Sequence, residues 1–269
     1  MKAFVYHFAF EFRSNLRNPE LLLLDYLFPL GFYVLMGAVM TQINPTFKET
    51  MVPAMVIFAV MVSTVLGIPS PLVSAREAGV FRSYKINGVP SLSILVIPAL
   101  STIFHALITS LIICVTAVPL FKGLAPTNWG IFALLTLLIA FSYGSIAALI
   151  GVISTTSQST VLWSQLIFLP SMILGGLMLP VSMLPRSIQP FTFLLPTTHA
   201  LQAYIGLTYG QNTLIDPMIA VAVLLVSGLL AFGLSVYLFN WDSKNTSRRG
   251  HPLMALLALV PYIVSVFLV

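Results

Sequence analysis

Charged residues are scarce in this chain: Lys, Arg, Asp and Glu make up 7% of its 269 residues, whereas roughly a quarter of the residues in soluble domains are charged. Between Lys85 and Asp242 only Lys122, Arg186 and Asp216 carry a charge. Hydrophobic residues account for 58% of the chain, and the mean hydropathy is +1.02. A water-soluble fold cannot cover that much apolar surface, so the composition indicates an integral membrane protein.

Cysteine is almost absent as well. Cys114 is the sole cysteine and lies inside an apolar run, which excludes a disulfide framework and a thiolate metal site. The four histidines show no HExxH spacing, and the sequence contains no GxSxG motif. These absences argue against an intramembrane protease or acyltransferase, because such enzymes need paired metal ligands or a nucleophile with a nearby base.

A phosphate-binding loop is missing too. Such a loop needs clustered glycines followed by Lys and then Ser or Thr, and none of the five lysines follows a glycine. The chain is therefore not expected to be an enzyme, to hydrolyse ATP or to hold a cofactor of its own.

Long continuous apolar runs are what the sequence has instead. About 20 apolar residues span a bilayer as a helix, and the runs predict six spans, at 21–43, 52–74, 91–119, 127–152, 160–180 and 217–240, with 253–269 as a candidate seventh. Short segments of alternating polarity, which mark membrane barrels, are absent. We therefore expect an all-α polytopic helical bundle.

Basic residues cluster in a way that predicts the topology. If the N-terminus is cytoplasmic, nine of the twelve Lys and Arg residues fall in cytoplasmic segments, and only Lys48, Lys122 and Arg186 lie outside. This distribution follows the positive-inside rule. It also accounts for the net charge of +5 without a nucleic-acid partner.

Three regions are expected along the chain. Residues 1–20 predict an amphipathic helix on the membrane surface, with Phe4, Val5, Phe8 and Phe12 at helical spacing and basic residues facing lipid headgroups. Residues 21–241 form the transmembrane domain. Residues 242–269 form a basic cytoplasmic linker and an additional apolar segment.

Two ionisable residues lie inside predicted spans, where such groups are candidates for function. Asp25 is one turn inside the first span, so its carboxylate either reaches the interface, pairs with Arg17, or serves ion coupling. His105 is near the middle of the third span and is either hydrogen-bonded to a neighbouring helix or has a proton-linked or substrate-contacting role. A coupled secondary transporter that uses both residues is therefore an alternative function.

The insert between the second and third spans is more elaborate than a connector. It predicts an amphipathic helix within 75–90, which Gly88 and Pro90 end. Aromatic residues and arginine are typical anchors of protein interfaces, so the helix is either a docking element or a solvated basic loop. Its candidate contact residues are Arg76, Glu77, Gly79, Val80, Phe81, Arg82, Tyr84 and Lys85.

A second irregular region follows the fifth span. Gly175 and Gly176 are expected within that span, and prolines then recur at 180, 185, 190 and 196. No long helix tolerates that spacing. Two short helices that dip back into the membrane from outside would fit, and the alternative is an ordinary proline-rich loop.

At these two regions the sequence resembles the membrane permeases of type 2 ATP-binding-cassette (ABC) exporters. The family's Arg-Glu-x-Gly stretch and following proline match Arg76-Glu77-Ala78-Gly79 and Val89-Pro90. Its late block is similar to residues 175–180, the Leu184-Pro185 pair and the Pro-x-x-His element of 196–199. Arg17-Asn18-Pro19 and Phe28-Pro29 are similar as well, so the resemblance covers roughly residues 1–241.

The resemblance implies how the chain works. The 75–90 helix would be a coupling helix that docks on a separate cytoplasmic ATPase subunit, which binds ATP and Mg. Short helices between 181 and 200 would form an external gate, with Gly175, Gly176, Pro180, Leu184, Pro185, Pro196 and His199 as signature residues. A second copy or a sister permease would complete the transporter in the cell membrane of a prokaryote. The nearly charge-free interior favours an amphipathic or lipid-like cargo, such as a drug or a glycolipid.

Overall fold

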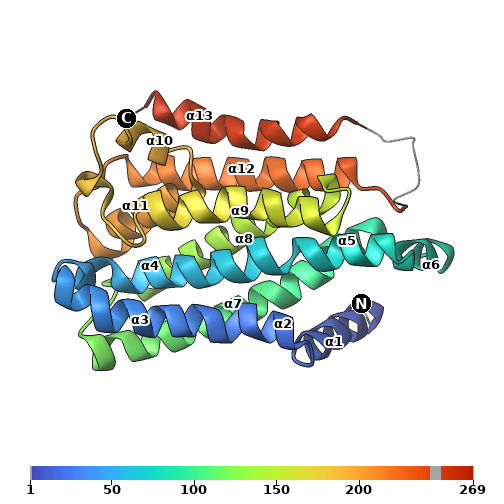
Figure 1. Cartoon of the computed structure of the whole chain (residues 1–269), viewed down its shortest axis with the longest axis horizontal. Coiled ribbons are helices and arrows are strands. Elements are labelled where there is room, and N and C mark those ends of the chain that lie inside the picture. The colour runs from blue at the N-terminus through green and yellow to red at the C-terminus, as the bar shows by residue number, and fades with distance from the viewer. Residues whose placement is uncertain (1, 243–249, 269) are drawn as a thin grey trace.

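Long apolar helices lie side by side in the computed structural model, which describes residues 2–242 and 250–268 (Figure 1). The first crossing consists of α2 (Pro19–Leu22), a π-helical turn η1 (Leu23–Leu27) and α3 (Phe28–Ile43). The second consists of α4 (Phe47–Met61), a π-helical turn η2 (Val62–Leu66) and α5 (Pro69–Glu77). The remaining long helices are α7 (Ser91–Phe121), α8 (Trp129–Ile153), α9 (Ser157–Leu174) and α12 (Pro217–Leu238).

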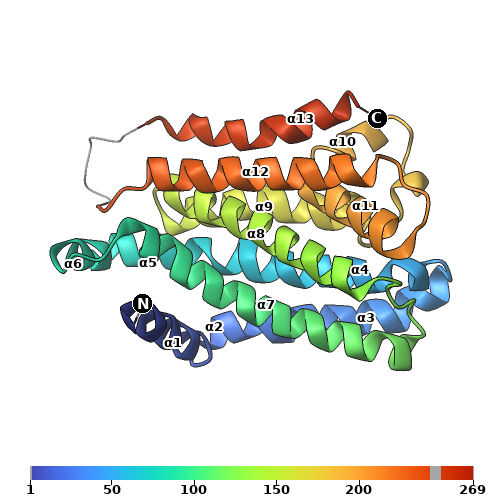
Figure 2. The same ribbon diagram turned by 180° about the vertical axis from the view of Figure 1, so that it is seen from behind.

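Shorter elements lie at the two ends of the bundle (Figure 1, Figure 2). At one end are α1 (Lys2–Asn15) and α6 (Val80–Ile86). At the other are the 3₁₀ turn η3 (Val181–Met183), α10 (Gln189–Thr192) and the start of α11 (Pro196–Tyr209). We refer to these as the α6 end and the α10 end.

Five helices among the described residues are long and apolar enough to cross a membrane: 19–43, 47–77, 91–121, 129–153 and 217–238. They correspond to five of the six predicted spans, and the chain is a polytopic helical membrane protein. The predicted fifth span was too long. Helix α9 stops at Leu174, so Gly175 and Gly176 lie beyond it rather than within it.

The second crossing is the core of the bundle. Its most apolar stretch is 94% buried, and α4 packs against α3, α7, α8 and α11, while η2 also contacts α9. Within lipid, close packing rather than the hydrophobic effect holds such a helix in place. The second crossing therefore packs against most of the other long helices.

Proline shapes the first crossing. Pro29 has no N–H, so the carbonyl of Asp25, four residues earlier, loses its helical donor. The Thr109 hydroxyl on α7 donates to that oxygen at 2.6 Å. A neighbouring helix thus satisfies a carbonyl that proline leaves without a donor, as the membrane interior requires.

Helix α1 was predicted as a surface helix over residues 1–20, and the structure ends it at Asn15. Its aromatic side chains pack on α7: the rings of Phe8 and Phe12 lie 6.5 Å and 5.6 Å from that of Phe104. Contact of α1 with membrane lipid stays a prediction.

The chain after α12 folds back along the bundle. A 3₁₀ helix η4 (Pro252–Leu259) and α13 (Val260–Val266) run from the α6 end towards the α10 end beside α12 (Figure 2). The Ser227 hydroxyl of α12 donates to the Ala258 carbonyl at 2.8 Å. We call residues 252–266 the C-terminal segment.

Candidate functional site

The predicted 75–90 helix is in fact two helices. Gly79 adopts a φ of +75° between α5 and α6, a left-handed conformation that glycine enters without the steric cost of a Cβ. Arg76 and Glu77 consequently belong to the last turn of α5. Helix α6 contains Val80, Phe81, Arg82, Tyr84 and Lys85.

Arg76 is buried, which does not favour its predicted place on a docking surface, and binding of a partner there stays a prediction. Its guanidinium donates to the carbonyl of Val152 at 3.0 Å and to that of Ser154, and 7% of the residue is exposed. These carbonyls end α8, where cationic side chains are favoured by the helix dipole. Arg76 thus connects the end of the second crossing to the end of α8.

Glu77, the last residue of α5, is exposed, and its side chain lies beside the start of α9. The Ser157 hydroxyl donates to its Oε2 at 3.3 Å, close to a helix N-terminus that favours negative charge. Glu77 therefore links α5 to α9 while remaining accessible.

Phe81 also turns inward rather than outward. It is 4% exposed and its ring lies 5.7 Å from that of Phe239, beyond the end of α12. Ile68, Leu72 and Ile94 belong to the same small apolar cluster. An aromatic ring at this spacing anchors α6 to the bundle by burying apolar surface.

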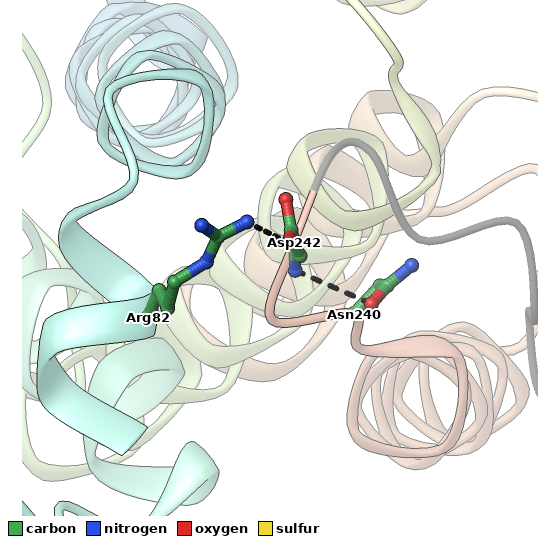
Figure 3. A network of polar contacts seen from close by, with 3 residues as sticks. All are labelled: Arg82, Asn240 and Asp242. Atoms are coloured by element: carbon green, nitrogen blue, oxygen red, sulfur yellow. Dashed lines mark hydrogen bonds and ion pairs between the residues drawn. The ribbon is translucent and has the colours of Figure 1, made fainter. Parts of the chain in front are cut away.

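Val80, Arg82 and Lys85 of α6 are exposed. Arg82 forms an ion pair with Asp242, whose backbone N–H donates to Asn240 Oδ1 at 3.3 Å (Figure 3). The sequence analysis missed Asp242, since no local pattern relates positions 160 residues apart. Together, these contacts hold α6 against the chain that follows α12.

Helix α1 approaches the other side of α6. The His7 and Tyr84 rings meet edge to face at 6.2 Å, and His7 Nε2 lies 3.5 Å from Glu11 Oε1. Burial raises the pKa of the Glu11 carboxyl, although His7 acts in the opposite direction. Burial, and then the nearby Glu11, raise the pKa of the Tyr84 phenol. A cavity of about 190 Å³ lies between the two helices.

At the α10 end, the gate segment (residues 175–209) returns into the bundle. Gly176 has a φ of +88°, and a Cβ at Gly175 would lie 2.7 Å from the Thr197 Cβ. Both positions therefore require glycine. Pro180, Leu184 and Pro185 flank the turn η3, and Pro196 begins α11.

Helix α11 is more extensive than the predicted short helices between 181 and 200. It continues to Tyr209, and its first nine residues are all buried, with contacts to α4, α8 and α12. The Thr197 hydroxyl hydrogen-bonds to the Tyr143 hydroxyl of α8 at 2.6 Å and donates to Met61 Sδ of α4 at 3.8 Å. The gate segment therefore contacts the second crossing directly.

His199 joins the gate segment to the C-terminal segment. Its Nε2 hydrogen-bonds to Ser265 Oγ at 2.9 Å, and its Nδ1 lies 3.2 Å from the Leu195 carbonyl. The ring meets that of Tyr262 at 5.4 Å, and all three side chains are buried. Sequence pattern gave no signal for Ser265 or Tyr262.

Asp25 neither reaches the surface nor pairs with Arg17. It is 2% exposed, and its Oδ1 has no hydrogen-bond partner among the described residues. His105 hydrogen-bonds through Nδ1 to the Tyr26 hydroxyl at 2.5 Å, and Phe12 stacks on it at 4.4 Å. His105 thus hydrogen-bonds to a neighbouring helix, as one interpretation expected, and a proton-linked role stays a prediction.

Metal coordination finds no support in the part of the chain that the structure describes: no group of three or more His, Cys, Asp or Glu side chains gathers there. The candidate site consists instead of a contact surface on α6 and a packed gate segment.

Comparison with known proteins gives one match. Residues 2–209 match the family described as ABC-2 type transporter, which takes in α6, most of the crossings and the whole gate segment. No curated protein and no solved structure matches the chain. Since the match covers well over half of the sequence and includes both regions where the resemblance was seen, the chain belongs to the ABC-2 type transporter family.

Proposed function

We propose that this chain is the permease subunit of an ATP-driven exporter and that α6 receives the movement of a separate cytoplasmic ATPase subunit. The observation that carries this proposal is that α6 combines exposed side chains with a buried aromatic anchor. Val80, Arg82 and Lys85 are exposed, while the buried Phe81 anchors the helix in the bundle. A helix held in this way transmits a push instead of absorbing it.

The anchorage extends into the core. Gly79 joins α6 to α5, and Arg76 fixes α5 to the end of α8. A displacement of α6 would therefore move the second crossing together with α8 rather than bend a loop.

The second crossing also supports a link to the gate segment. Met61 on α4 contacts Thr197 on α11, and Tyr143 on α8 hydrogen-bonds to the same threonine. We propose that closure of two ATPase subunits shifts these packed helices between two arrangements, one inward-facing and one outward-facing. Contact alone supports this path, and a measured coupling would establish it.

The distribution of charge supports the proposed orientation, and membership of the family supports the proposed assembly. The α6 end carries Arg17, Arg76, Arg82 and Lys85, so it is the cytoplasmic end under the positive-inside rule. One chain supplies half of a translocation path, and a second copy or a sister permease completes it. The apolar interior favours an amphipathic or lipid-like cargo, such as a drug or a glycolipid, and the setting is a prokaryotic cell membrane.

The test is recovery of an ATPase subunit with the full-length protein after gentle solubilisation of its native membrane. Arg82 and Lys85 are exposed, so R82E/K85E changes the docking face without touching the buried anchor. We expect recovery of the ATPase to fall about tenfold or more, which corresponds to about 1.4 kcal/mol of binding.

Arg186→Glu is the matched control, because Arg186 is equally exposed but lies at the α10 end. It should retain the ATPase. Equal recovery from the wild type and R82E/K85E would refute docking through this face of α6.

A coupled secondary transporter is the second candidate, and one observation favours it. The buried Asp25 carboxyl, on a π-helical turn, lacks a hydrogen-bond partner at Oδ1 among the described residues. π-Helical turns are frequent at functional sites. Transport that stops on collapse of the proton gradient and in an Asp25→Asn, His105→Gln variant would support this candidate, whereas transport that persists would exclude it.

A further inference from the structure

A groove runs between α9 and the C-terminal segment. Its floor is α8 (Ile146, Leu149, Ile150), one wall is α9 (Trp163, Leu166, Ile167), and the other wall is η4 (Leu253, Leu256, Leu259). Leu194, Leu195 and Pro196, at the start of α11, close one end. The volume of the groove is about 300 Å³. This is near the lower limit for small-molecule sites in proteins.

The chemistry of the lining selects the ligand. Every side chain that lines the groove is aliphatic, proline or tryptophan. A polar group placed there would lose its water without gaining hydrogen bonds, and water itself is not retained in an apolar cavity. The groove therefore fits a hydrocarbon chain and excludes ions, sugars and nucleotides.

The rims of the groove are exposed. Leu166 is 63% exposed on the α9 side, and Leu253 and Leu256 are 63% and 53% exposed on the η4 side. Helix α9 packs on α8 and η4 packs on α12, and both α8 and α12 are long and apolar enough to cross a membrane. Lipid tails would therefore be the solvent around these rims. An acyl chain can therefore enter sideways from the bilayer.

A polar pocket adjoins one end of the groove. Ile153 and Pro252 line both the groove and a neighbouring pocket, whose wall includes Arg76, Ser154, Thr155, Asn240 and Asp242. Cationic, anionic and hydroxyl groups thus lie at the α6 end, and hydrocarbon surface continues from there towards Pro196. This arrangement matches an amphiphile with a charged head and an alkyl tail. A second copy of this chain would instead place apolar helix faces against both the polar pocket and the groove, which matches the polar pocket less well.

We propose that the groove binds one acyl chain of a membrane phospholipid, with the headgroup at the α6 end and the chain terminus near Pro196. The C-terminal segment is then a lipid-binding element, and it lies outside the residues that match the family. Lipid binding at this site requires neither an ATPase partner nor transport, so it can be tested independently of the proposed function.

The experiment uses the full-length protein in phosphatidylcholine vesicles that contain a trace of phosphatidylcholine with a photoreactive diazirine on one acyl chain. Two probes are compared, one with the diazirine near the headgroup and one with it near the terminal methyl. We expect the first to label residues 153–155 and 252–253, and the second to label residues 194–196 and 256–259. Mass spectrometry of the labelled peptides reads the result.

Ala255→Trp fills the groove, since Ala255 lines it, and should reduce labelling at these positions about tenfold, the factor for about 1.4 kcal/mol. Leu257→Trp is the control, because Leu257 lies on the same element, is 49% exposed and does not line the groove. Size-exclusion elution and thermal unfolding check that both variants fold.

Labelling that is unchanged in Ala255→Trp, or that is uniform over all exposed helices, would overturn the proposal in favour of bulk lipid. Cross-links from the groove to a second copy of the chain would overturn it in favour of a subunit interface. Labelling with the two probes exchanged would refute the stated orientation of the lipid.

Discussion

His199 Nε2 on α11 and Ser265 Oγ on α13 form a 2.9 Å hydrogen bond that ties the gate segment to the C-terminal segment. Ser265 Oγ also hydrogen-bonds to the Tyr262 carbonyl at 2.7 Å, and the Tyr262 ring packs on the imidazole. Both partners are buried. The Pro-x-x-His element of the gate segment is therefore held from outside the family-matched region.

Removal of this hydrogen bond should loosen the gate segment. Ser265→Ala leaves a buried imidazole nitrogen without its partner, which costs about 1–3 kcal/mol. We expect a lower unfolding temperature in detergent and faster proteolysis within residues 181–195. Val264→Ala, at a neighbouring residue that is 51% exposed, should leave both unchanged, and an equal loss in the two variants would deny the bond a specific role.

Arg76 and Arg82 should differ sharply on replacement. Arg76→Ala strips a buried donor from two carbonyls at the end of α8, and the loss is about 1–3 kcal/mol. Arg82→Ala removes an ion pair in which the arginine side chain is 61% exposed, and such pairs contribute about 0–1 kcal/mol.

Thermal unfolding of the two purified variants measures this difference. Arg76→Lys should not restore wild-type stability, because lysine lacks the planar fork that reaches two carbonyls. A lower unfolding temperature for Arg82→Ala than for Arg76→Ala would contradict the buried role of Arg76.

Gly176 and Gly233 offer a paired test of backbone conformation. Gly176→Ala forces a Cβ into a φ of +88° and to 2.8 Å from Leu201, so we expect a loss of about 1 kcal/mol or more. Gly233 lies within α12, where an added Cβ meets nothing within 4 Å. Gly233→Ala should gain about 0.5–1 kcal/mol from helix propensity. Unfolding temperatures that move in the same direction for both would contradict this account.

The aromatic anchor of α6 should behave differently from its exposed face. Phe81→Ala removes a buried ring, a change that costs about 3–5 kcal/mol in well-packed cores, so we expect protease sensitivity at residues 78–90 as well as loss of coupling. Lys85→Ala should leave protease resistance intact. Wild-type resistance in Phe81→Ala would show that the ring does not anchor α6.

The crossings could be predicted because length and hydropathy alone decide them. The end of the second crossing could not be predicted from the sequence. The break at Gly79 depends on one backbone angle, and the inward turn of Phe81 depends on Phe239, a residue far along the chain. The sequence analysis therefore predicted a helix in this region but not its break at Gly79 or the burial of Arg76 and Phe81.

The gate segment shows the same limit. The prolines predicted broken helices, yet the extent of α11 to Tyr209 follows from packing on α4, α8 and α12. The hydrogen bond between His199 and Ser265 joins residues 66 positions apart, and no periodicity or motif relates them. Likewise, the burial of Asp25 depends on how the first three crossings meet.

Cross-linking from α6 in native membranes tests the central claim most directly. The native Cys114 is buried, so a cysteine at Lys85 can be addressed with a short bifunctional reagent, and one at Arg186 serves as the control from the opposite end. The account predicts that Lys85→Cys, but not Arg186→Cys, becomes linked to a separate chain that contains a nucleotide-binding loop. Failure of Lys85→Cys to capture such a chain, with the reagent shown to react at that cysteine, would contradict coupling through α6.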